Sequence, residues 1–219
     1  MLKRFAPLLA ALLTWLALTP ALAQDDAPSP PPEPKVQLVA LDTAMGTITV
    51  AIEVERAPVT AANFLRYVDQ HRFDGTVFYR SMKLDWGDQP NGLIQAGTQY
   101  DPKRTLPAIA HEPTNVTGVH HIKGALSMAR NEPGTATGDF SILMQELPSM
   151  DADPGSDDPE TRAGYAAFGH VVAGWDVVEK IHAAPTDPNK GEGWMKGQML
   201  SPPVKIIRAY RVDGVPTGA

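Results

Sequence analysis

Residues 36–52, VQLVALDTAMGTITVAI, give the first indication of the fold. Within this segment Ile48, Val50 and Ile52 alternate with small or polar residues, which is the period of two of a β-strand with one apolar face. A second apolar run precedes it at Val36–Leu41, and Met45-Gly46 separates the two runs. Apolar runs joined by a glycine-containing bend are typical of a β-hairpin, so we predict two antiparallel strands, at 36–41 and 47–52.

The rest of the chain carries more strand patterns than helix patterns. One helix is predicted from Ala57-Pro58 to about Gln70, because proline is tolerated in a first helical turn. A second is predicted at Trp175–His182, where apolar residues recur every three positions. Six further strands are predicted, at Thr76–Tyr79, Leu93–Gln95, Ala125–Ala129, Phe140–Met144, Ala166–Val172 and Val204–Tyr210. Many short strands with only two helices favour a mainly β closed antiparallel barrel, since a doubly wound sheet needs more helices between its strands.

The first 23 residues have the pattern of a signal peptide. Lys3 and Arg4 form a basic start, an apolar run follows at Phe5–Leu18, and Ala21-Leu22-Ala23 places small residues where a signal peptidase cleaves. Cleavage after residue 23 predicts a periplasmic or secreted protein. An uncleaved membrane anchor is the alternative, although the apolar run is short for a bilayer span.

Beyond the leader, composition divides the chain into three parts. Residues 24–35 are rich in proline and acid and nearly lack apolar side chains, which predicts an extended linker. Residues 36–212 are predicted to form one folded domain, and residues 213–219 a C-terminal tail. No internal repeat is present.

Charge and cysteine content narrow the classes of partner. The chain has 19 basic and 25 acidic residues, and loss of Lys3 and Arg4 with the leader leaves 17 basic residues and a net charge of −8. That balance disfavours nucleic acid or an anionic membrane surface as the main partner, and no stable membrane insertion is expected after processing. The chain has no cysteine, which excludes disulfides and a lipid-modified leader. Nothing in the sequence requires more than a monomer.

Five segments, in order along the chain, resemble the motifs of one protein family. They are Thr60–Phe64, Phe78-Tyr79-Arg80, Gly92–Gly97, Gly124–Ala129 and Phe168–Val178. They are similar to motifs of the cyclophilin-type peptidyl-prolyl cis–trans isomerases, and the resemblance as a whole covers roughly residues 37–210. The resemblance implies an eight-stranded closed antiparallel barrel capped by two α-helices, which is compatible with the strand and helix patterns. It also implies isomerase activity on the X–Pro bonds of proline-containing polypeptides, with no metal or organic cofactor.

The chemistry of this reaction needs a hydrogen-bond donor more than it needs a nucleophile. Rotation about an X–Pro bond breaks amide resonance, with a barrier of about 18–20 kcal/mol, but cleaves no bond. In the twisted amide the proline nitrogen regains its lone pair and accepts a hydrogen bond. A guanidinium, charged at neutral pH and with several fixed donors, is suited to this. The resemblance assigns Arg80 as the catalytic arginine and Gln95 as the glutamine that holds it.

The expected proline pocket departs from the family pattern. The resemblance predicts substrate contacts from nine residues: Phe78, Leu93, Ile94, Ala129, Arg130, Phe140, Ser141, Met150 and Tyr165. Ser141 stands in place of a pocket phenylalanine, Tyr165 in place of a histidine, and Ser149 where some members have a tryptophan that binds cyclosporin. Two alignments remain open, because either Gly92 and Leu93 or Leu93 and Ile94 occupy the positions of a phenylalanine and a methionine. Weaker binding of the proline ring is expected, and a barrel that binds proline segments without isomerising them is the alternative.

Several other patterns suggest different sites. Residues 81–91 are longer than the family usually has and contain Trp86, so they are expected to form a flap that either shapes substrate choice or is merely solvated. The acidic residues 151–160 resemble a calcium loop only loosely, since Ser156 occupies the usual glycine position, and a solvated loop is favoured. Adjacent His120 and His121 point to opposite faces of a strand and poorly suit one metal ion. A hydrolase built from Ser127, His121 and an aspartate lacks a Gly-x-Ser-x-Gly elbow.

Overall fold

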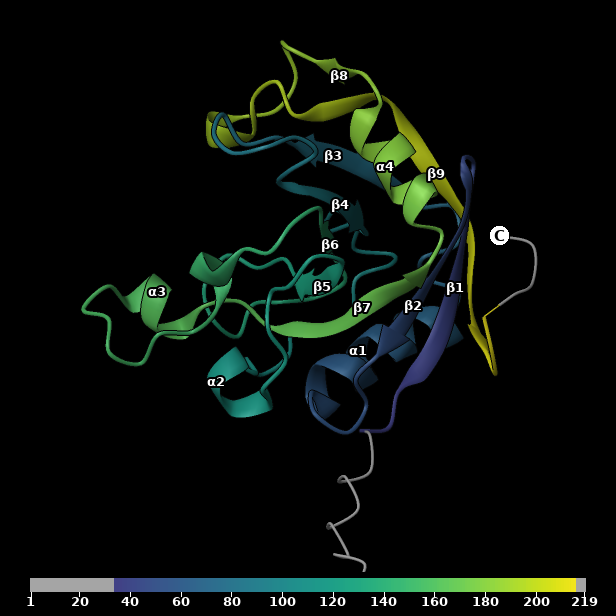
Figure 1. Cartoon of the computed structure of the whole chain (residues 1–219). Helices are drawn as coiled ribbons and strands as arrows, with labels where there is room; N and C mark the ends of the chain where they lie inside the picture. The colour runs from purple at the N-terminus through teal and green to yellow at the C-terminus, as the bar shows by residue number, and fades with distance from the viewer. Residues whose placement is uncertain (1–33, 216–219) are drawn as a thin grey trace, which may run out of the picture. The chain divides into compact units, whose positions relative to one another are not determined.

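A computed structural model describes residues 34–215 of the chain, and Figure 1 shows its arrangement. The predicted leader, nearly all of the predicted linker and residues 216–219 lie outside the described residues. Within the described part, no helix is long and apolar enough to cross a bilayer.

The described chain forms one antiparallel sheet that closes on itself. Its strands are β1 (Gln37–Thr43), β2 (Gly46–Ile52), β3 (Val77–Met82), β4 (Leu93–Gly97), β5 (Ala125–Met128), β6 (Phe140–Leu143), β7 (Ala167–Ala173), β8 (Thr186–Asp187) and β9 (Met199–Val212). They are ordered β1-β2-β7-β5-β6-β4-β3-β9-β8, and pairing of β1 with β9 closes eight of them into a barrel. The predicted barrel and its hairpin at residues 36–52 are confirmed, since β1 and β2 pair from Gln37 opposite Ile52 to Thr43 opposite Gly46.

Two helices cover the barrel, as predicted. Helix α1 (Pro58–Asp69) begins with its proline, and α4 (Trp175–Ala183) follows β7. The α1 residue Phe64 is buried, and its ring lies 5.1 to 5.3 Å from the rings of Phe73, Phe140 and Phe168. These aromatic contacts join α1 to the barrel core. Two short helices, α2 (Thr114–Thr117) and α3 (Pro159–Ala163), lie in connecting segments where the sequence showed no periodic pattern.

The C-terminal strand differs most from the sequence expectation. Strand β9 begins at Met199, five residues before the predicted start at Val204, and the short β8 pairs with its first part. This first part contains Pro202 and Pro203, and proline cannot donate to a ladder, which is why the local sequence does not indicate a strand there. The early start is consequential, since Met199 pairs with Arg80 on β3 and brings the β8–β9 connection next to that arginine.

The sheet formed by β4, β6 and β5 has two chemically distinct faces. Ile94, Ile142 and Leu126 are register partners across these strands and belong to the barrel core. The neighbouring row of partners is Gln95, Ser141 and Ser127, and it faces the opposite way because successive strand side chains alternate. We call the side that bears this second row the outer face.

Candidate active site

Arg80 lies at the edge of this polar row and is held by two amides. It pairs with Gln95 across β3 and β4, so its side chain continues the outer face. Its Nη1 donates to Gln95 Oε1 at 2.8 Å and its Nε donates to Gln198 Oε1, also at 2.8 Å. Burial lowers the pKa of Arg80 to about 10, which still leaves the guanidinium charged at neutral pH. The two predicted catalytic residues therefore meet in a fixed and charged donor group.

One nitrogen of the guanidinium has no partner. Arg80 Nη2 is buried and makes no hydrogen bond in the described structure, and the residue as a whole is only 3% exposed. A buried donor without an acceptor carries a desolvation cost that an incoming acceptor can relieve. The arrangement thus leaves one donor of a positioned cation unused.

The connection between β8 and β9 supplies two contacts that the sequence did not reveal. The indole ring of Trp194 lies over the Arg80 guanidinium, 4.4 Å from ring centroid to Cζ. Gln198 bonds Arg80 through its Oε1, while its Nε2 donates to the Trp194 carbonyl at 3.0 Å. Gln198 is 118 positions from Arg80 in the chain, and only the pairing of β9 with β3 brings it there.

The register of β4 decides between the two open alignments. Leu93 lies two residues from Gln95 and shares the outer face, whereas Ile94 is fully buried in the barrel core. Gly92, with φ +81°, then stands at the position of the family's phenylalanine, and a Cβ there would collide with the carbonyl oxygen of Met82. The chain therefore has Leu93 but no phenyl ring beside it.

Three of the predicted substrate contacts lie elsewhere. Phe78, Ile94 and Phe140 are fully buried in the core cluster of the barrel, so they support the sheet from inside and present no surface to a peptide. Phe140 and Phe78 contact each other edge to face at 6.3 Å. We correct their assignment from substrate-binding to structural residues.

Ser141 and Met150 are both on the outer side of the barrel. Ser141 pairs with Gln95 on one side and with Ser127 on the other, and it is 6% exposed. Met150 is partly buried and packs on the small apolar cluster that includes Leu143 and Leu147. The ring that the family pattern places at position 141 is absent, and a hydroxyl faces outward instead.

Tyr165 is held in place by Arg130. The Arg130 guanidinium stacks on the Tyr165 ring at 4.5 Å, donates to Glu160 Oε2 at 2.8 Å and donates to the Gly164 carbonyl at 2.6 Å. Ala129, the preceding residue, is partly exposed. Arg130 therefore acts on the site through Tyr165 and the start of the segment that follows α3.

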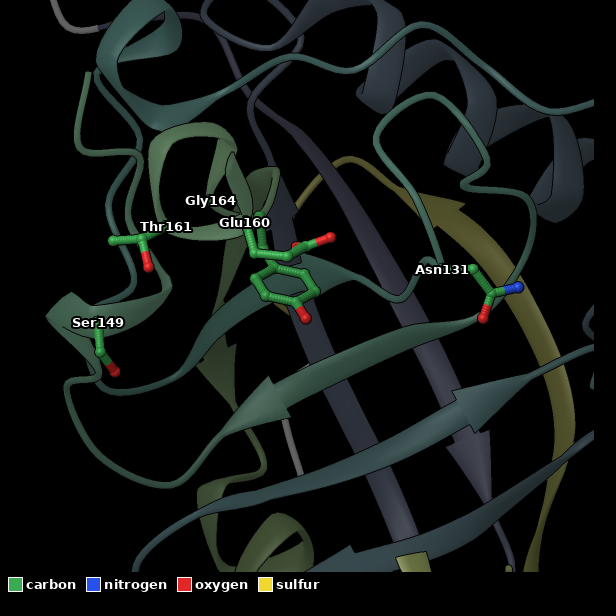
Figure 2. A pocket seen from close by; sticks show the side chains of 6 residues that line it. Asn131, Ser149, Glu160, Thr161 and Gly164 are labelled. Carbon is green, nitrogen blue, oxygen red and sulfur yellow. The ribbon is translucent and has the colours of Figure 1, made fainter. Parts of the chain in front are cut away.

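A cavity of about 200 Å³ opens beside Tyr165. Its lining residues are Asn131, Ser149, Glu160, Thr161, Gly164 and Tyr165. Figure 2 shows Ser149 and Thr161 on one side of it and Asn131 on the other, with Glu160 between them. Arg80 is not part of this lining, so the cavity extends the site on the side of α3 and is distinct from the donor group itself.

A buried polar chain lies behind Ser127. His121 Nδ1 and Asp151 Oδ1 are 2.6 Å apart, and His121 Nε2 and Ser127 Oγ are 2.8 Å apart. Burial lowers the pKa of His121. For Asp151, burial alone would raise the pKa, but hydrogen bonds from His121 and His120 outweigh it and lower the pKa. A neutral His121 therefore donates from Nδ1 to an ionised Asp151 and accepts the Ser127 hydroxyl at Nε2.

The hydrogen-bonded series Asp151, His121 and Ser127 has the same residue types as a hydrolase triad, but its surroundings do not suit hydrolysis. Ser127 is 1% exposed and sits in the middle of β5, between register partners on both sides. Its Oγ projects from the outer face but is buried and hydrogen-bonded to the buried His121, so it is not presented to a substrate carbonyl. The sequence around Ser127 also lacks the Gly-x-Ser-x-Gly elbow, and we interpret the bonded series Ser127, His121 and Asp151 as structural.

The other sites suggested by the sequence, at the flap and at the acidic segment, show only local contacts or solvent exposure. Trp86, in the segment expected to form a flap, is 62% exposed. In the acidic segment, Asp158 caps α3 by accepting from the Thr161 N–H, and Arg162 donates to the Ser156 carbonyl. Across residues 34–215, no three His, Cys, Asp or Glu side chains gather as a metal ion would require.

The fold and the sequence together define the class of protein. Residues 38–210 match the family model described as cyclophilin type peptidyl-prolyl cis-trans isomerase. This chain belongs to that family, and its relatives are named as peptidyl-prolyl cis–trans isomerases, which makes it a member of an enzyme family.

Bacterial relatives are among the proteins most similar to it. The chain is 34% identical over 174 residues to a peptidyl-prolyl cis-trans isomerase of Acinetobacter baylyi, which covers 78% of this chain and 82% of the relative. It is 32% identical over 187 residues to peptidyl-prolyl cis-trans isomerase A of Dickeya dadantii, covering 82% and 86% respectively.

A solved structure supports the fold. A cyclophilin type peptidyl-prolyl cis-trans isomerase from Cryptosporidium parvum, crystallised in the presence of the dipeptide Ala-Pro, superposes with a TM-score of 0.64. The match covers 81% of this chain and all of that chain at 19% sequence identity. The predicted eight-stranded closed barrel of the cyclophilin type is thereby confirmed.

Proposed function

We propose that Arg80 accelerates X–Pro isomerisation in exported polypeptides by donating from Nη2 to the proline nitrogen of the twisted amide. The observation that carries this is the single unpaired nitrogen of a charged guanidinium whose other two nitrogens each donate a hydrogen bond. In a planar amide the nitrogen lone pair is delocalised and accepts poorly. In the twisted amide it is localised, so the bond from Nη2 is made only near the transition state, and such differential binding raises the rate.

Gln95 and Gln198 are the positioning residues of this mechanism. Each amide oxygen accepts from a different nitrogen of Arg80, and two bonds at 2.8 Å fix both the tilt and the reach of the guanidinium plane. A donor that is already oriented needs no reorganisation when the amide twists. The similar structure from Cryptosporidium parvum, crystallised in the presence of Ala-Pro, supports a proline-containing peptide as the ligand of this barrel.

The test is exchange spectroscopy on an Ala-Pro peptide with the protein lacking residues 1–23. Uncatalysed exchange takes tens to hundreds of seconds, so catalysis is readily seen. Faster exchange that disappears when Arg80 is replaced supports the proposal. Peptide line broadening without faster exchange would instead support a proline-binding barrel without catalysis, the reading favoured by the loss of the ring at Ser141.

The Ser141→Phe variant is expected to bind proline peptides more tightly. A phenyl ring on the outer face beside Leu93 adds an apolar contact that covers part of the proline ring, worth about 1 kcal/mol, or a KM lower by about fivefold. Because that contact exists in the ground state as well, kcat is expected to change little. Steady-state kinetics on the variant measure the two separately.

Ser141→Ala is the matched control for the ring, since it removes the hydroxyl without adding apolar surface. Its KM is expected to stay within twofold of the unmodified protein. A folded Ser141→Phe variant whose KM is unchanged or raised would show that position 141 does not face the bound proline.

We further propose that the protein is exported and that its leader is removed after Ala23. The basic start, apolar run and Ala-Leu-Ala sequence support cleavage there. When the full chain is expressed in a Gram-negative host, the expected product is a periplasmic protein whose mass and N-terminal sequence begin at Gln24. An Ala23→Leu variant is expected to accumulate uncleaved, and a membrane-bound native chain that starts at Met1 would contradict the proposal.

A further inference from the structure

Trp194 is a large apolar side chain in an exposed position next to a nearly enclosed cation. Its side chain is among the exposed large hydrophobic groups, at 73% exposure, whereas Arg80 beneath it is 3% exposed. One face of the indole is used by the guanidinium, and the rest of the ring is open to solvent. Because Nη2 is itself buried and the indole lies over the guanidinium, an acceptor that reaches Nη2 has to come against this ring.

The segment that carries Trp194 is closed by its own hydrogen bonds. The Gly197 N–H donates to the Lys190 carbonyl at 2.8 Å, and the Gln198 N–H donates to the Met195 carbonyl at 3.1 Å. The Gln198 side chain then ties this turn to Arg80, because its Nε2 donates to the Trp194 carbonyl while its Oε1 accepts from Arg80. Trp194 takes part in these bonds only through its backbone carbonyl, and its indole makes none of them. The turn therefore holds the backbone in place while the ring remains available for contact.

The charges around the ring select its ligand. The Arg80 guanidinium already stacked on the ring disfavours a second cation over the open part of the indole. An aromatic side chain has no such penalty and gains offset or edge-to-face contact with the ring. The outer face meanwhile lacks aromatic rings at the positions of Gly92, Ser141 and Ser149, so an aromatic contact has to come from elsewhere in the site.

We propose that Trp194 is a specificity-determining residue that binds an aromatic side chain adjacent to the isomerised proline. The inference rests on the proposed role of Arg80, since it takes the bound proline to lie at Nη2. It makes aromatic-flanked prolines the preferred substrate class, ahead of glycine-flanked prolines, with lysine-flanked prolines least favoured.

The kinetic test compares peptides that differ only in the residues flanking the proline. Phenylalanine, glycine and lysine are placed before the proline in one series and after it in another. In the better series, the native protein is expected to show a kcat/KM for the phenylalanine peptide about three- to tenfold above that of the glycine peptide. Trp194→Ala is expected to bring this ratio to about one, and Trp194→Phe to restore part of it.

Trp86→Ala is the matched control, because Trp86 has a comparable exposure of 62% and no stacking contact with Arg80. It is expected to keep the native ratio within twofold. A native ratio near one in both series, or a ratio that survives in a folded Trp194→Ala variant, would overturn the inference.

A binding measurement separates this inference from the proposed catalytic role. Titration with the phenylalanine peptide is expected to shift the Trp194 indole N–H resonance, identified by its loss in Trp194→Ala, and to leave that of Trp86 in place. If the protein binds but does not accelerate exchange, this shift still supports the Trp194 subsite while the catalytic proposal fails. If exchange is catalysed and Arg80-dependent but the Trp194 resonance does not move, the catalytic proposal stands and the subsite is refuted.

Discussion

Replacement of Arg80 by alanine is expected to lower kcat/KM for X–Pro isomerisation about 100- to 1000-fold, the usual loss when one preorganised transition-state donor is removed. No other cation is bonded to Gln95 and Gln198 in the described structure, so nothing substitutes for the guanidinium. The fold is expected to persist, because the variant also removes a buried cation with an unpaired nitrogen, which partly offsets the two lost hydrogen bonds. Exchange spectroscopy on the Ala-Pro peptide measures the loss.

The matched control is Arg208→Ala on β9. Arg208 also stacks on an aromatic ring, that of Tyr210 at 4.0 Å, but its side chain is 54% exposed. Its replacement is expected to leave kcat/KM within twofold. Arg80→Lys is expected to recover only a small part of the activity, since an ammonium cannot bond both glutamines and still donate in the same plane. Arg80→Ala with native activity would refute the assigned role.

The pH dependence of the Arg80 contribution follows from its pKa. Burial lowers that pKa to about 10, and an arginine is charged below its pKa. Between pH 6 and 8 the protonated form dominates, so the rate difference between the native protein and Arg80→Ala is expected to be flat. It is expected to shrink only as the pH approaches 10.

Local patterns predicted the barrel well because each strand has a recognisable pattern of apolar residues within a few positions. Alternation at 47–52 and the apolar run at 36–41 each reflect side chains on one buried face, and that information is local. The same applies to Arg80 and Gln95, which lie in short motifs. The expected strand at 204–210 came out longer because its first part is set by pairing with β3 and β8 and not by its own composition.

The substrate contact expected at Phe78 failed because strand β3 is irregular there. Phe78 and Arg80 are two residues apart and would share a face in a regular strand, yet Phe78 is in the core and Arg80 is outside. A register shift between Phe78 and Arg80 on β3 separates them. For Ile94 no irregularity intervenes, so the alternation from Gln95 could have excluded it from the substrate contacts.

Trp194 and Gln198 were beyond sequence reasoning for a different reason. They lie in a glycine-rich connection without periodicity, more than 110 positions from Arg80, and only the pairing of β9 with β3 brings them to it. The family resemblance rested on five motifs and included neither residue. Asp151 was likewise not identified as the partner of His121, because the two residues lie 30 positions apart and no short motif joins them.

His121→Ala is expected to lower the free energy of unfolding by about 2–4 kcal/mol, because it leaves the buried Ser127 hydroxyl unpaired and opens a cavity behind β5. His120→Ala is the matched control: His120 also bonds Asp151, but its side chain is 59% exposed, and about 0.5 kcal/mol or less is expected. Chemical denaturation of the three proteins gives the comparison. An equal fall in the free energy of unfolding in both variants would show that the buried hydrogen bonds of His121 to Asp151 and Ser127 do not stabilise the fold.

The loss in His121→Ala is expected to depend on pH with a definite sign. Burial lowers the folded-state pKa of His121, so below about 6.5 the unfolded chain binds a proton that the folded chain does not. The stability that neutral His121 provides is present above that pH and falls as the pH is lowered, which makes the two unfolding free energies converge toward pH 5. His182 has a pKa lowered mainly by burial as well, but it is common to both proteins and cancels in the difference.

The same variant is expected to weaken substrate binding, because His121 holds the segment that carries Met150. The His121 side chain and backbone N–H both bond Asp151, the residue after Met150, and the His121 carbonyl accepts from the Leu147 N–H at 2.8 Å. Losing the side chain bond loosens Met150 while leaving Arg80 and its two glutamines intact. A KM raised about threefold or more at 15 °C, with kcat nearly unchanged, is therefore expected. A fall in kcat with KM unchanged would show that His121 and its bonded partners take part in the chemical step, and would contradict their structural role.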